Sequence, residues 1–194
     1  MIIGVCGLIG SGKGTVADIL QDDFGFAKIS FADSLKDAVA AIFSWDRDLL
    51  EGATAESREW REKVDPWWAE RLKMPDLTPR LVLQLWGTEV CRTGFHQDIW
   101  IASLERKINK DRNYVIPDTR FPNEIDLIKK IGGEIWCVKR GADPSWFSQY
   151  QIGGSPPNDI HSSEWEWARS KFSKTLQNNG TLDDLKNLVR DHLS

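Results

Sequence analysis

The chain has 194 residues, of which 41% are hydrophobic and 28% charged, an ordinary globular mixture that excludes a disordered chain. Acidic residues outnumber basic ones by 29 to 25, so long-range attraction to nucleic acid or to an anionic membrane is not expected. No apolar run reaches the roughly 18–20 residues that span a bilayer. The three cysteines match no metal or redox motif, which suits a reducing cytoplasm. We therefore expect a cytoplasmic protein without direct nucleic-acid or membrane binding.

Short apolar runs alternate with amphipathic segments along the chain. In chain order, the expected strands are residues 2–6, 27–31, 114–117, 134–139 and 174–177. The expected helices are residues 15–20, 35–43, 79–92, 98–109, 123–131 and a last one through Leu193, which a Thr181–Asp184 pair caps. This alternation predicts an α/β fold with a mostly parallel sheet between layers of helices, a three-layer sandwich.

Two segments interrupt the alternation. Residues 45–77 are charged, rich in tryptophan and broken by two prolines, so we expect an inserted helical arm. Residues 141–160 contain Gly, Pro, Ser and Asn without clear periodicity, so we expect a long loop there, and a lid-like segment over about 141–168. The length predicts one domain over residues 1–194, because domains usually run to about 100–200 residues.

A glycine-rich loop lies between the first expected strand and the first helix. Its glycines let the backbone N–H groups turn toward a phosphate, and the positive end of the next helix faces the same anion. Lys13 adds a charge that can reach the β- and γ-phosphates of a nucleoside triphosphate. An ordinary glycine turn is the weaker interpretation, because strand, glycines, lysine and helix occur in the order that a phosphate-binding P-loop requires. The residues expected to bind the ATP phosphates are Gly7, Gly10, Ser11, Gly12, Lys13, Gly14 and Thr15.

The hydroxyl residue of this loop is displaced by one position. The general motif places Ser or Thr directly after the lysine, whereas here Gly14 follows Lys13 and the hydroxyl belongs to Thr15. Gly-Lys-Gly-Thr is similar to the loop of adenylate kinases and related nucleoside monophosphate kinases. Mg²⁺ usually keeps several waters and binds to substrate phosphates. We therefore expect Thr15 and Asp118 to hold Mg²⁺ partly through water.

A second polar group follows the strand at 114–117. Ligands of α/β sheets bind at the carboxyl ends of strands, where Asp118, Thr119 and Arg120 lie. Asp118 can order metal-bound water or orient the acceptor, and Arg120 can bind a phosphate through two hydrogen bonds. The alternative is that Asp118 and Thr119 cap the helix that begins near Asn123. Glu124 is one turn further on and can reach the same site or remain outside it.

Each of the other candidate residues has a functional interpretation and a purely structural one. On a helical wheel, Arg80, Gln84 and Gly87 share one face of the helix at 79–92, with Thr88 at its edge. This face can admit a ligand or be a solvated surface. Three further sites are Trp100, which can stack on a base or belong to the core; Arg140, a lid arginine or a surface charge; and Asn178-Asn179-Gly180, an adenine contact or a turn. Ser163 with Glu166 is compatible with a capping box.

Several motifs together point to a known family. They are Phe31-Ala32-Asp33-Ser34-Leu35-Lys36, Gly87-Thr88-Glu89, Trp100, Pro117-Asp118-Thr119-Arg120, His161-x-Ser163-Glu164 and Asn179-Gly180-Thr181-Leu182. With the glycine-rich loop, they resemble the bacteriophage deoxynucleoside monophosphate kinases. The resemblance extends from residue 2 to about residue 190 and is least clear at 45–77 and 141–158.

The resemblance implies a P-loop kinase that uses ATP and Mg²⁺ to convert deoxynucleoside monophosphates to diphosphates for DNA synthesis, in the host cytoplasm if the chain comes from a phage. The monophosphate site it implies comprises Arg80, Gln84, Gly87, Thr88, Trp100, Asp118, Arg120 and Glu124, to which the strand end adds Thr119. Because a monophosphate acceptor is already anionic, no catalytic base is expected, and the catalytic residues are those that position and neutralise phosphates. We expect these to be Lys13, Asp118, Arg120 and Arg140.

Two other functions share the loop. Another small P-loop kinase, such as a dephospho-coenzyme A kinase or an adenylate kinase relative, would have the same loop and sheet. A nucleotide-binding protein without catalysis would need no arginines at the acceptor site. A homodimer is compatible with the sequence.

Overall fold

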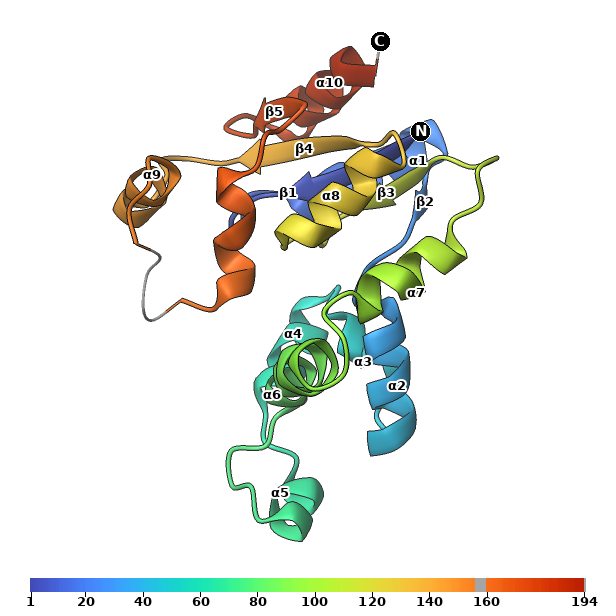
Figure 1. The fold of residues 1–194 in the computed structure, drawn as a ribbon, viewed down its shortest axis with the longest axis vertical. Helices are drawn as coiled ribbons and strands as arrows, with labels where there is room; N and C mark the ends of the chain where they lie inside the picture. Colours follow the sequence, from blue (N-terminus) through green and yellow to red (C-terminus); the bar gives the residue numbers. More distant parts are fainter. Residues whose placement is uncertain (156–159, 194) are drawn as a thin grey trace. The chain divides into compact units, whose positions relative to one another are not determined.

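The computed structural model describes residues 1–155 and 160–193. Five parallel strands form one sheet in the described residues, in the order β2-β3-β1-β4-β5 (Figure 1). Their bounds are β1 Ile2–Cys6, β2 Ala27–Lys28, β3 Tyr114–Ile116, β4 Glu134–Lys139 and β5 Lys174–Gln177. The expectation of a parallel α/β sheet is confirmed. The strand expected at 27–31 is shorter, because only two of its residues pair with β3.

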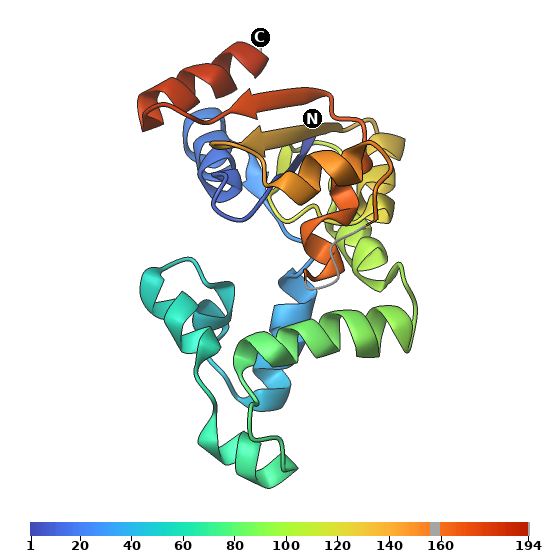
Figure 2. The ribbon, with the colours of Figure 1, turned by 90° about the vertical axis from the view of Figure 1, so that its left-hand side faces the viewer.

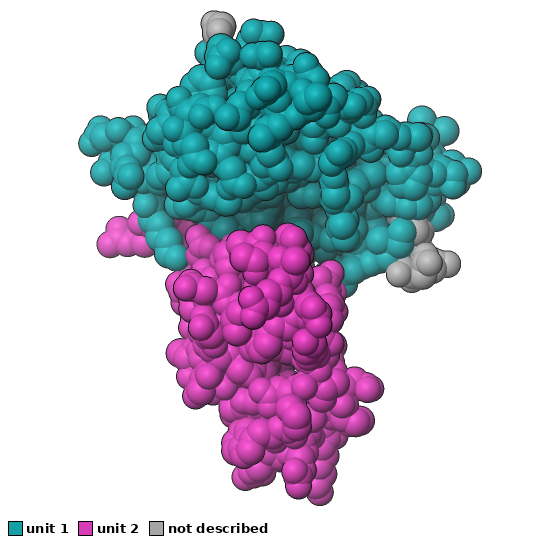
Figure 3. Space-filling model, turned by 180° about the vertical axis from the view of Figure 1, so that it is seen from behind, with its two compact units in different colours: residues 1–30, 107–194 teal, residues 31–106 magenta. Residues whose placement is uncertain are grey.

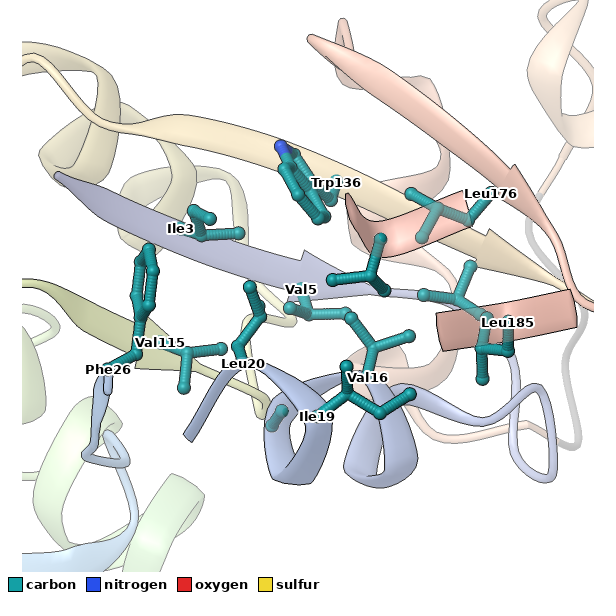
Figure 4. Close-up of a cluster of buried hydrophobic side chains, with 13 residues drawn as sticks. Ile3, Val5, Val16, Ile19, Leu20, Phe26, Val115, Trp136, Leu176 and Leu185 are labelled. Carbon is teal, nitrogen blue, oxygen red and sulfur yellow. The ribbon is translucent and has the colours of Figure 1, made fainter. Parts of the chain in front are cut away.

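Two helices cover one face of the sheet. They are α1, Lys13–Phe24, and α10, Leu182–Leu193. Figure 4 shows their apolar residues against Ile3 and Val5 of the central strand, which are fully buried. The capping pair expected for α10 is confirmed, because the Thr181 N–H donates to Asp184 Oδ2 (2.8 Å) and the Asp184 N–H to Thr181 Oγ1 (3.2 Å).

The opposite face carries α8, Pro122–Lys130. Successive residues of a strand point to opposite faces, so Gly4 faces away from Ile3 and Val5. A Cβ on Gly4 would lie 2.5 Å from Ile128 Cδ1 of α8, so only glycine lets this helix approach β1 so closely. Helices on both faces give the three expected layers.

Parallel strands bring their carboxyl ends to one edge of the sheet. Gly7 follows β1, the central strand, and Asp118 lies just beyond β3 beside it. On the other side of β1, Arg140 follows β4 and Asn178 follows β5. Figure 2 shows β4 and β5 side by side. The order of the strands therefore gathers segments that are far apart in the sequence.

The chain divides into two compact units, which Figure 3 shows in different colours. Unit 1 comprises Met1–Ser30 and Lys107–Ser194 and holds the sheet; unit 2 comprises Phe31–Arg106. The helices of unit 2 are α2 Asp33–Phe43, α3 Arg47–Glu51, α4 Ala55–Glu62, α5 Pro66–Leu72, α6 Pro79–Gln84, the π-helix η1 Leu85–Thr93 and most of α7, Ile99–Lys107. Three of these helices lie within the arm expected at 45–77.

Aromatic residues hold unit 2 together. Phe43 stacks on Trp45 with 4.5 Å between ring centroids, and the Trp68 indole N–H donates to the Phe43 carbonyl (3.0 Å). The Trp45 indole N–H donates to Asp65 Oδ2 (2.8 Å), which ties α5 to the chain that follows α2. Tryptophans of the arm therefore pack against aromatic neighbours, and the indole N–H groups of Trp45 and Trp68 have acceptors.

The prediction of a long loop over residues 141–160 is wrong for the first half of that segment. Residues Ser145–Gln151 form the helix α9, and Phe147 in it is fully buried against Trp167, with 5.6 Å between ring centroids. The helix is short and depends on this tertiary contact, so its sequence carries no lasting periodicity. Two 3₁₀ turns follow, η2 Ser162–Glu164 and η3 Glu166–Arg169. Residues 156–159 of the expected lid-like segment lie outside the described residues. Within the described residues, no helix is long and apolar enough to cross a membrane.

Candidate active site

The glycine-rich loop has the backbone conformation that its glycines permit. Gly10 and Gly12 have φ angles of 78° and 104°, in the left-handed region that side chains disfavour. A Cβ on Gly12 would also lie 2.4 Å from Asn178 Nδ2. The helix α1 begins directly after Gly12, so its first N–H groups face the loop, as phosphate binding requires.

Lys13 folds back over its own loop. Its Nζ donates to the carbonyl oxygens of Gly7 (2.7 Å) and Leu8 (2.8 Å). Burial and the positive charge of Arg120 together lower the pKa of Lys13 to about 8, although Glu164 acts in the opposite direction. Lys13, Arg120 and Glu164 therefore belong to one electrostatic site.

We expect ATP binding at pH 8 to be accompanied by uptake of about half a proton, because Lys13 is then half protonated and a bound polyphosphate raises its pKa. The enthalpy of ATP binding, measured in buffers of different ionisation enthalpy, reports this uptake. Lys13→Arg is the matched control, since arginine stays charged at this pH. Glu164→Gln should increase the uptake, because Glu164 raises the Lys13 pKa. A buffer-independent enthalpy for the wild type would contradict the assignment.

The segment after β5 holds the loop in place. The Asn178 side chain is buried, and its Nδ2 donates to the carbonyl of Ser11 (2.9 Å). The neighbouring Asn179 accepts a hydrogen bond from the Gly141 N–H through Oδ1 (2.7 Å). The sequence marked Asn178 as part of a turn or an adenine contact, and its bond to the phosphate loop was not expected. The adenine contact of Asn179 and Gly180 stays a prediction.

Asp118 lies at the carboxyl end of β3, as expected, and is half-buried. The hydroxyl of Ser30, which lies beyond β2 at the same edge of the sheet, donates to Asp118 Oδ2 (2.5 Å). This bond fixes one oxygen of the carboxylate. Ser30 is therefore a residue of the site that the sequence analysis missed.

Glu124 positions the backbone that carries Arg120. Its Oε2 accepts from the N–H groups of Arg120 (2.7 Å) and Phe121 (3.1 Å), and its side chain is buried. A carboxylate on the first free N–H groups of α8 satisfies them and offsets the helix dipole. The capping function considered for Asp118 and Thr119 therefore belongs to Glu124.

The Arg120 guanidinium forms an ion pair with Glu164 of η2. The two side chains are 37% and 18% exposed, so the pair is partly shielded from water. Ser163 lies within η2, whose N-cap is His161, and the His161 side chain accepts the Ser163 N–H (3.3 Å); the capping box of Ser163 with Glu166 stays a prediction. Glu164 thus places a carboxylate on the arginine that we expect to bind phosphate.

Thr119 points into the protein. It is 1% exposed, and its hydroxyl donates to the Ile116 carbonyl (3.2 Å). The site of a Cβ on Gly4 lies 3.0 Å from this hydroxyl, so Thr119 packs beneath β1. Burial leaves its side chain no accessible surface in this structure, and its contact with substrate stays a prediction.

A cavity of about 400 Å³ lies beside the loop, a volume that suits a small ligand. Residues 8–11 line one side, and Arg140, Trp146 and Glu164 line the other. The hydroxyl of Ser11, in the lining, is buried and has no hydrogen-bond partner among the described residues. An unpartnered hydroxyl beside a glycine-rich loop suits a ligand with several acceptor oxygens.

Five residues expected at the monophosphate site belong to unit 2. Arg80 is 45% exposed and pairs with Glu62 (3.1 Å), Gln84 is exposed and Thr88 is half-buried. From Leu85 onward the helix is a π-helix, with hydrogen bonds from i to i+5 and a wider turn. The helical wheel at 100° per residue is therefore wrong beyond Gln84. It does not establish that Gly87 lies on the same face as Arg80.

Trp100 and Gly87, both expected at the substrate site, contact each other. The buried Trp100 indole N–H donates to the Gly87 carbonyl (2.9 Å). A Cβ on Gly87 would lie 2.8 Å from Leu35 Cδ2, so the backbone of η1 is close to α2. The structure thus links these two residues through the core of unit 2; their contact with substrate stays a prediction.

Trp100→Phe is expected to lower the free energy of unfolding by about 1 kcal/mol or more, because the Gly87 carbonyl loses its donor in a buried place. Chemical denaturation measures the change. Phe121→Leu in unit 1 is the comparison variant, because it loses aromatic packing without losing an indole N–H. A stability equal to the wild type would show that the hydrogen bond contributes nothing.

The parallel sheet and the phosphate-binding loop after its central strand define the class: the chain is a P-loop kinase. The fold is similar to the crystal structure of shikimate kinase from Aquifex aeolicus, with a TM-score of 0.50, 12% identity, and coverage of 100% of this chain and 96% of that one. No family model matches the chain.

Sequence comparison gives the family. The chain is 33% identical over 199 residues to the "Putative deoxynucleotide monophosphate kinase" of Acanthamoeba polyphaga mimivirus, covering 95% of this chain and 91% of that protein. A stretch of 56 residues is 46% identical to the deoxynucleoside-5'-monophosphate kinase of Escherichia phage T5, covering 28% of this chain and 22% of that one. An adenylate kinase of Anaeromyxobacter sp. (strain K) is 25% identical over 81% of this chain and 68% of its own length. The chain belongs to the deoxynucleoside monophosphate kinase family.

Proposed function

We propose that this protein transfers the terminal phosphoryl group of ATP to the phosphate of a deoxynucleoside monophosphate and so makes the diphosphate. The observation that carries the proposal is the sheet edge. It places the glycine-rich loop beside Asp118 and Arg120, in a chain of the deoxynucleoside monophosphate kinase family.

The acceptor explains why the site needs cations more than a base. A monophosphate carries a charge of about −1.5 to −2 near neutrality, so it is nucleophilic without losing a proton to the protein. The difficulty lies in bringing two anions together in line. Lys13 and Arg120 supply positive charge on either side of the loop, in a protein whose net charge is −4.

Each group at the site then has a defined task. The loop N–H groups hold the ATP phosphates, and Lys13 leaves the Gly7 and Leu8 carbonyls to bind them. Arg120 leaves Glu164 to bind a phosphate oxygen of the transferring or accepting group. Asp118, held by Ser30, orients the acceptor. Arg140, which lines the cavity beside the loop, adds charge when ATP is bound.

The donor set near the loop fits Mg²⁺ that is bound mainly by substrate phosphates. Among the described residues, no group of three or more His, Cys, Asp or Glu side chains could hold a metal alone. Thr15 is exposed at the start of α1, and Asp118 is a carboxylate at the same edge of the sheet. When bound, Mg²⁺ would neutralise phosphate charge, with Thr15 and Asp118 as ligands or as holders of its waters.

The remaining residues of the proposal concern recognition. Arg80 and Gln84 offer a cation and an amide to the monophosphate substrate, and Trp100 with Gly87 forms the packed part of its site. Asn179 and Gly180 are proposed to contact the adenine of ATP.

The test is a product panel. The purified protein is incubated with ATP, Mg²⁺ and one acceptor at a time: each deoxynucleoside monophosphate, each ribonucleoside monophosphate, or dephospho-coenzyme A. Diphosphates of deoxynucleosides are the expected products. Turnover of AMP alone would favour an adenylate kinase activity, and turnover of dephospho-coenzyme A would favour that kinase. ATP binding without transfer to any acceptor would overturn the proposal.

A further inference from the structure

Unit 2 contains a guanidinium group with an unsatisfied buried donor. Arg61, on α4, is half-buried, and its Nε is inaccessible to water and has no hydrogen-bond partner among the described residues. The other nitrogens lie over Gly52, where a Cβ would be 2.2 Å from both the guanidinium carbon and one terminal nitrogen. The left-handed φ of Gly52, 69°, and its missing side chain therefore make room for this group.

The charges around Arg61 do not neutralise it. Arg58 lies one turn earlier on α4 and is exposed, so it adds a like charge to the same face. Arg80 of α6 lies close by, because it pairs with Glu62, the next residue along α4 (3.1 Å). Burial lowers the pKa of Arg61, and the positive charges of Arg80 and Arg58 lower it too, whereas Glu62 and Glu51 only partly offset these effects.

The nearest acidic groups are already bound. Glu62 accepts from Arg80, and Glu51 accepts from both Lys36 (2.8 Å) and Arg47 (2.8 Å). Arg61 and Arg80 thus lie near one another at the end of α4 in an acidic protein, and Arg61 has an orphaned donor. An arginine has five N–H donors, and leaving them unpaired in a buried place is unfavourable. The arrangement calls for an additional anion.

We propose that Arg61 and Arg80 together bind the phosphate of the deoxynucleoside monophosphate, with Arg61 as a phosphate-binding residue that the sequence motifs do not mark. The inference rests on the proposed function and deepens it. A phosphate dianion has three terminal oxygens and can accept from two guanidinium groups at once, which a single carboxylate such as Glu62 cannot do as fully. When the phosphate binds, Arg80 exchanges Glu62 for it.

The experiment measures binding of a deoxynucleoside monophosphate without ATP, by titration calorimetry. Arg61→Gln is expected to raise the Kd for the monophosphate by about 10- to 100-fold, as for the loss of a charge-assisted hydrogen bond. The Kd for ATP should stay unchanged. The deoxynucleoside without its phosphate should bind the variant and the wild type equally, since only the phosphate contact is lost.

Arg58→Gln is the matched control. It removes an exposed arginine from the same helix, and its Nη1 donates only to the Ala53 carbonyl (3.3 Å). Its Kd for the monophosphate should stay within about twofold of the wild type. Gly52→Ala provides a second variant: it displaces the Arg61 guanidinium but keeps its charge, and it should also weaken monophosphate binding.

The results separate this inference from the proposed function. An unchanged Kd for the monophosphate in Arg61→Gln, with only a lower Tm, would show that the arginine merely packs against the end of α3, and would overturn the inference. Failure of the wild type to transfer phosphate, with monophosphate binding that depends on Arg61, would overturn the proposed function alone. A wild type that binds no monophosphate overturns both.

Discussion

Arg120→Gln is expected to lower kcat for phosphoryl transfer by roughly 10²–10³, the usual effect of losing one preorganised donor to a transition state. Arg120 lies at the end of β3, and its backbone N–H is held by Glu124 (2.7 Å). This bond fixes the backbone that carries the side chain, and the guanidinium exchanges Glu164 for a phosphate oxygen when substrate binds. Glutamine keeps much of the length but neither the charge nor the two parallel donors.

The fold of this variant should survive, because the Arg120–Glu164 pair is partly exposed and such pairs contribute little to stability. The variant also removes a charge that lowers the Lys13 pKa, so that pKa should rise. Single-turnover rates and a pH titration measure the two effects. Arg190→Gln on α10, in the same unit, is the control for loss of an arginine. A near-normal rate in Arg120→Gln would remove the arginine from the mechanism.

The parts of the site that could be predicted are short motifs of residues that are adjacent in the sequence. The glycines and Lys13 stand in one loop, and Asp118 and Arg120 directly follow an apolar run. Because strands alternate with helices, the sheet had to be parallel, and a parallel sheet brings both segments to the same edge. The capping pair Thr181–Asp184 is equally local, which is why it was correct.

The parts that were missed depend on contacts between distant segments. Asn178 binds the loop at Ser11 across 167 residues, and Ser30 binds Asp118 across 88. Glu164 reads as a residue of a local cap, yet its partner Arg120 is 44 residues away. A single sequence shows only which residues have such capacity; the fold decides which partner each one meets.

Backbone geometry was the other source of error. The helix that begins at Pro79 continues as a π-helix from Leu85, and an amphipathic pattern of ordinary period does not reveal the change. The helix α9 was missed for a related reason, since burial of Phe147 stabilises it rather than any repeating apolar face. Both errors concern local structure that tertiary packing determines.

Lys13→Met is expected to reduce kcat/KM for ATP by at least roughly 10²–10³ below pH 8. The loop N–H groups and α1 remain, so a nucleotide can still be held, but the charge that reaches the terminal phosphates is gone. The loss should shrink above pH 8, because the wild-type lysine itself becomes neutral there before ATP binds.

Stability should move in the opposite direction to activity. The folded-state pKa of Lys13 is about 8, below its ordinary value of 10.5, so the charged lysine destabilises the folded state at pH below 8. Wild-type stability should rise between pH 8 and 10.5, where the folded state releases this proton first. Lys13→Met removes that dependence, and its Tm at pH 7 should equal or exceed that of the wild type, despite the two lost hydrogen bonds to the loop. A variant that is both less stable and proportionally less active would mean that Lys13 serves the fold and not the transfer.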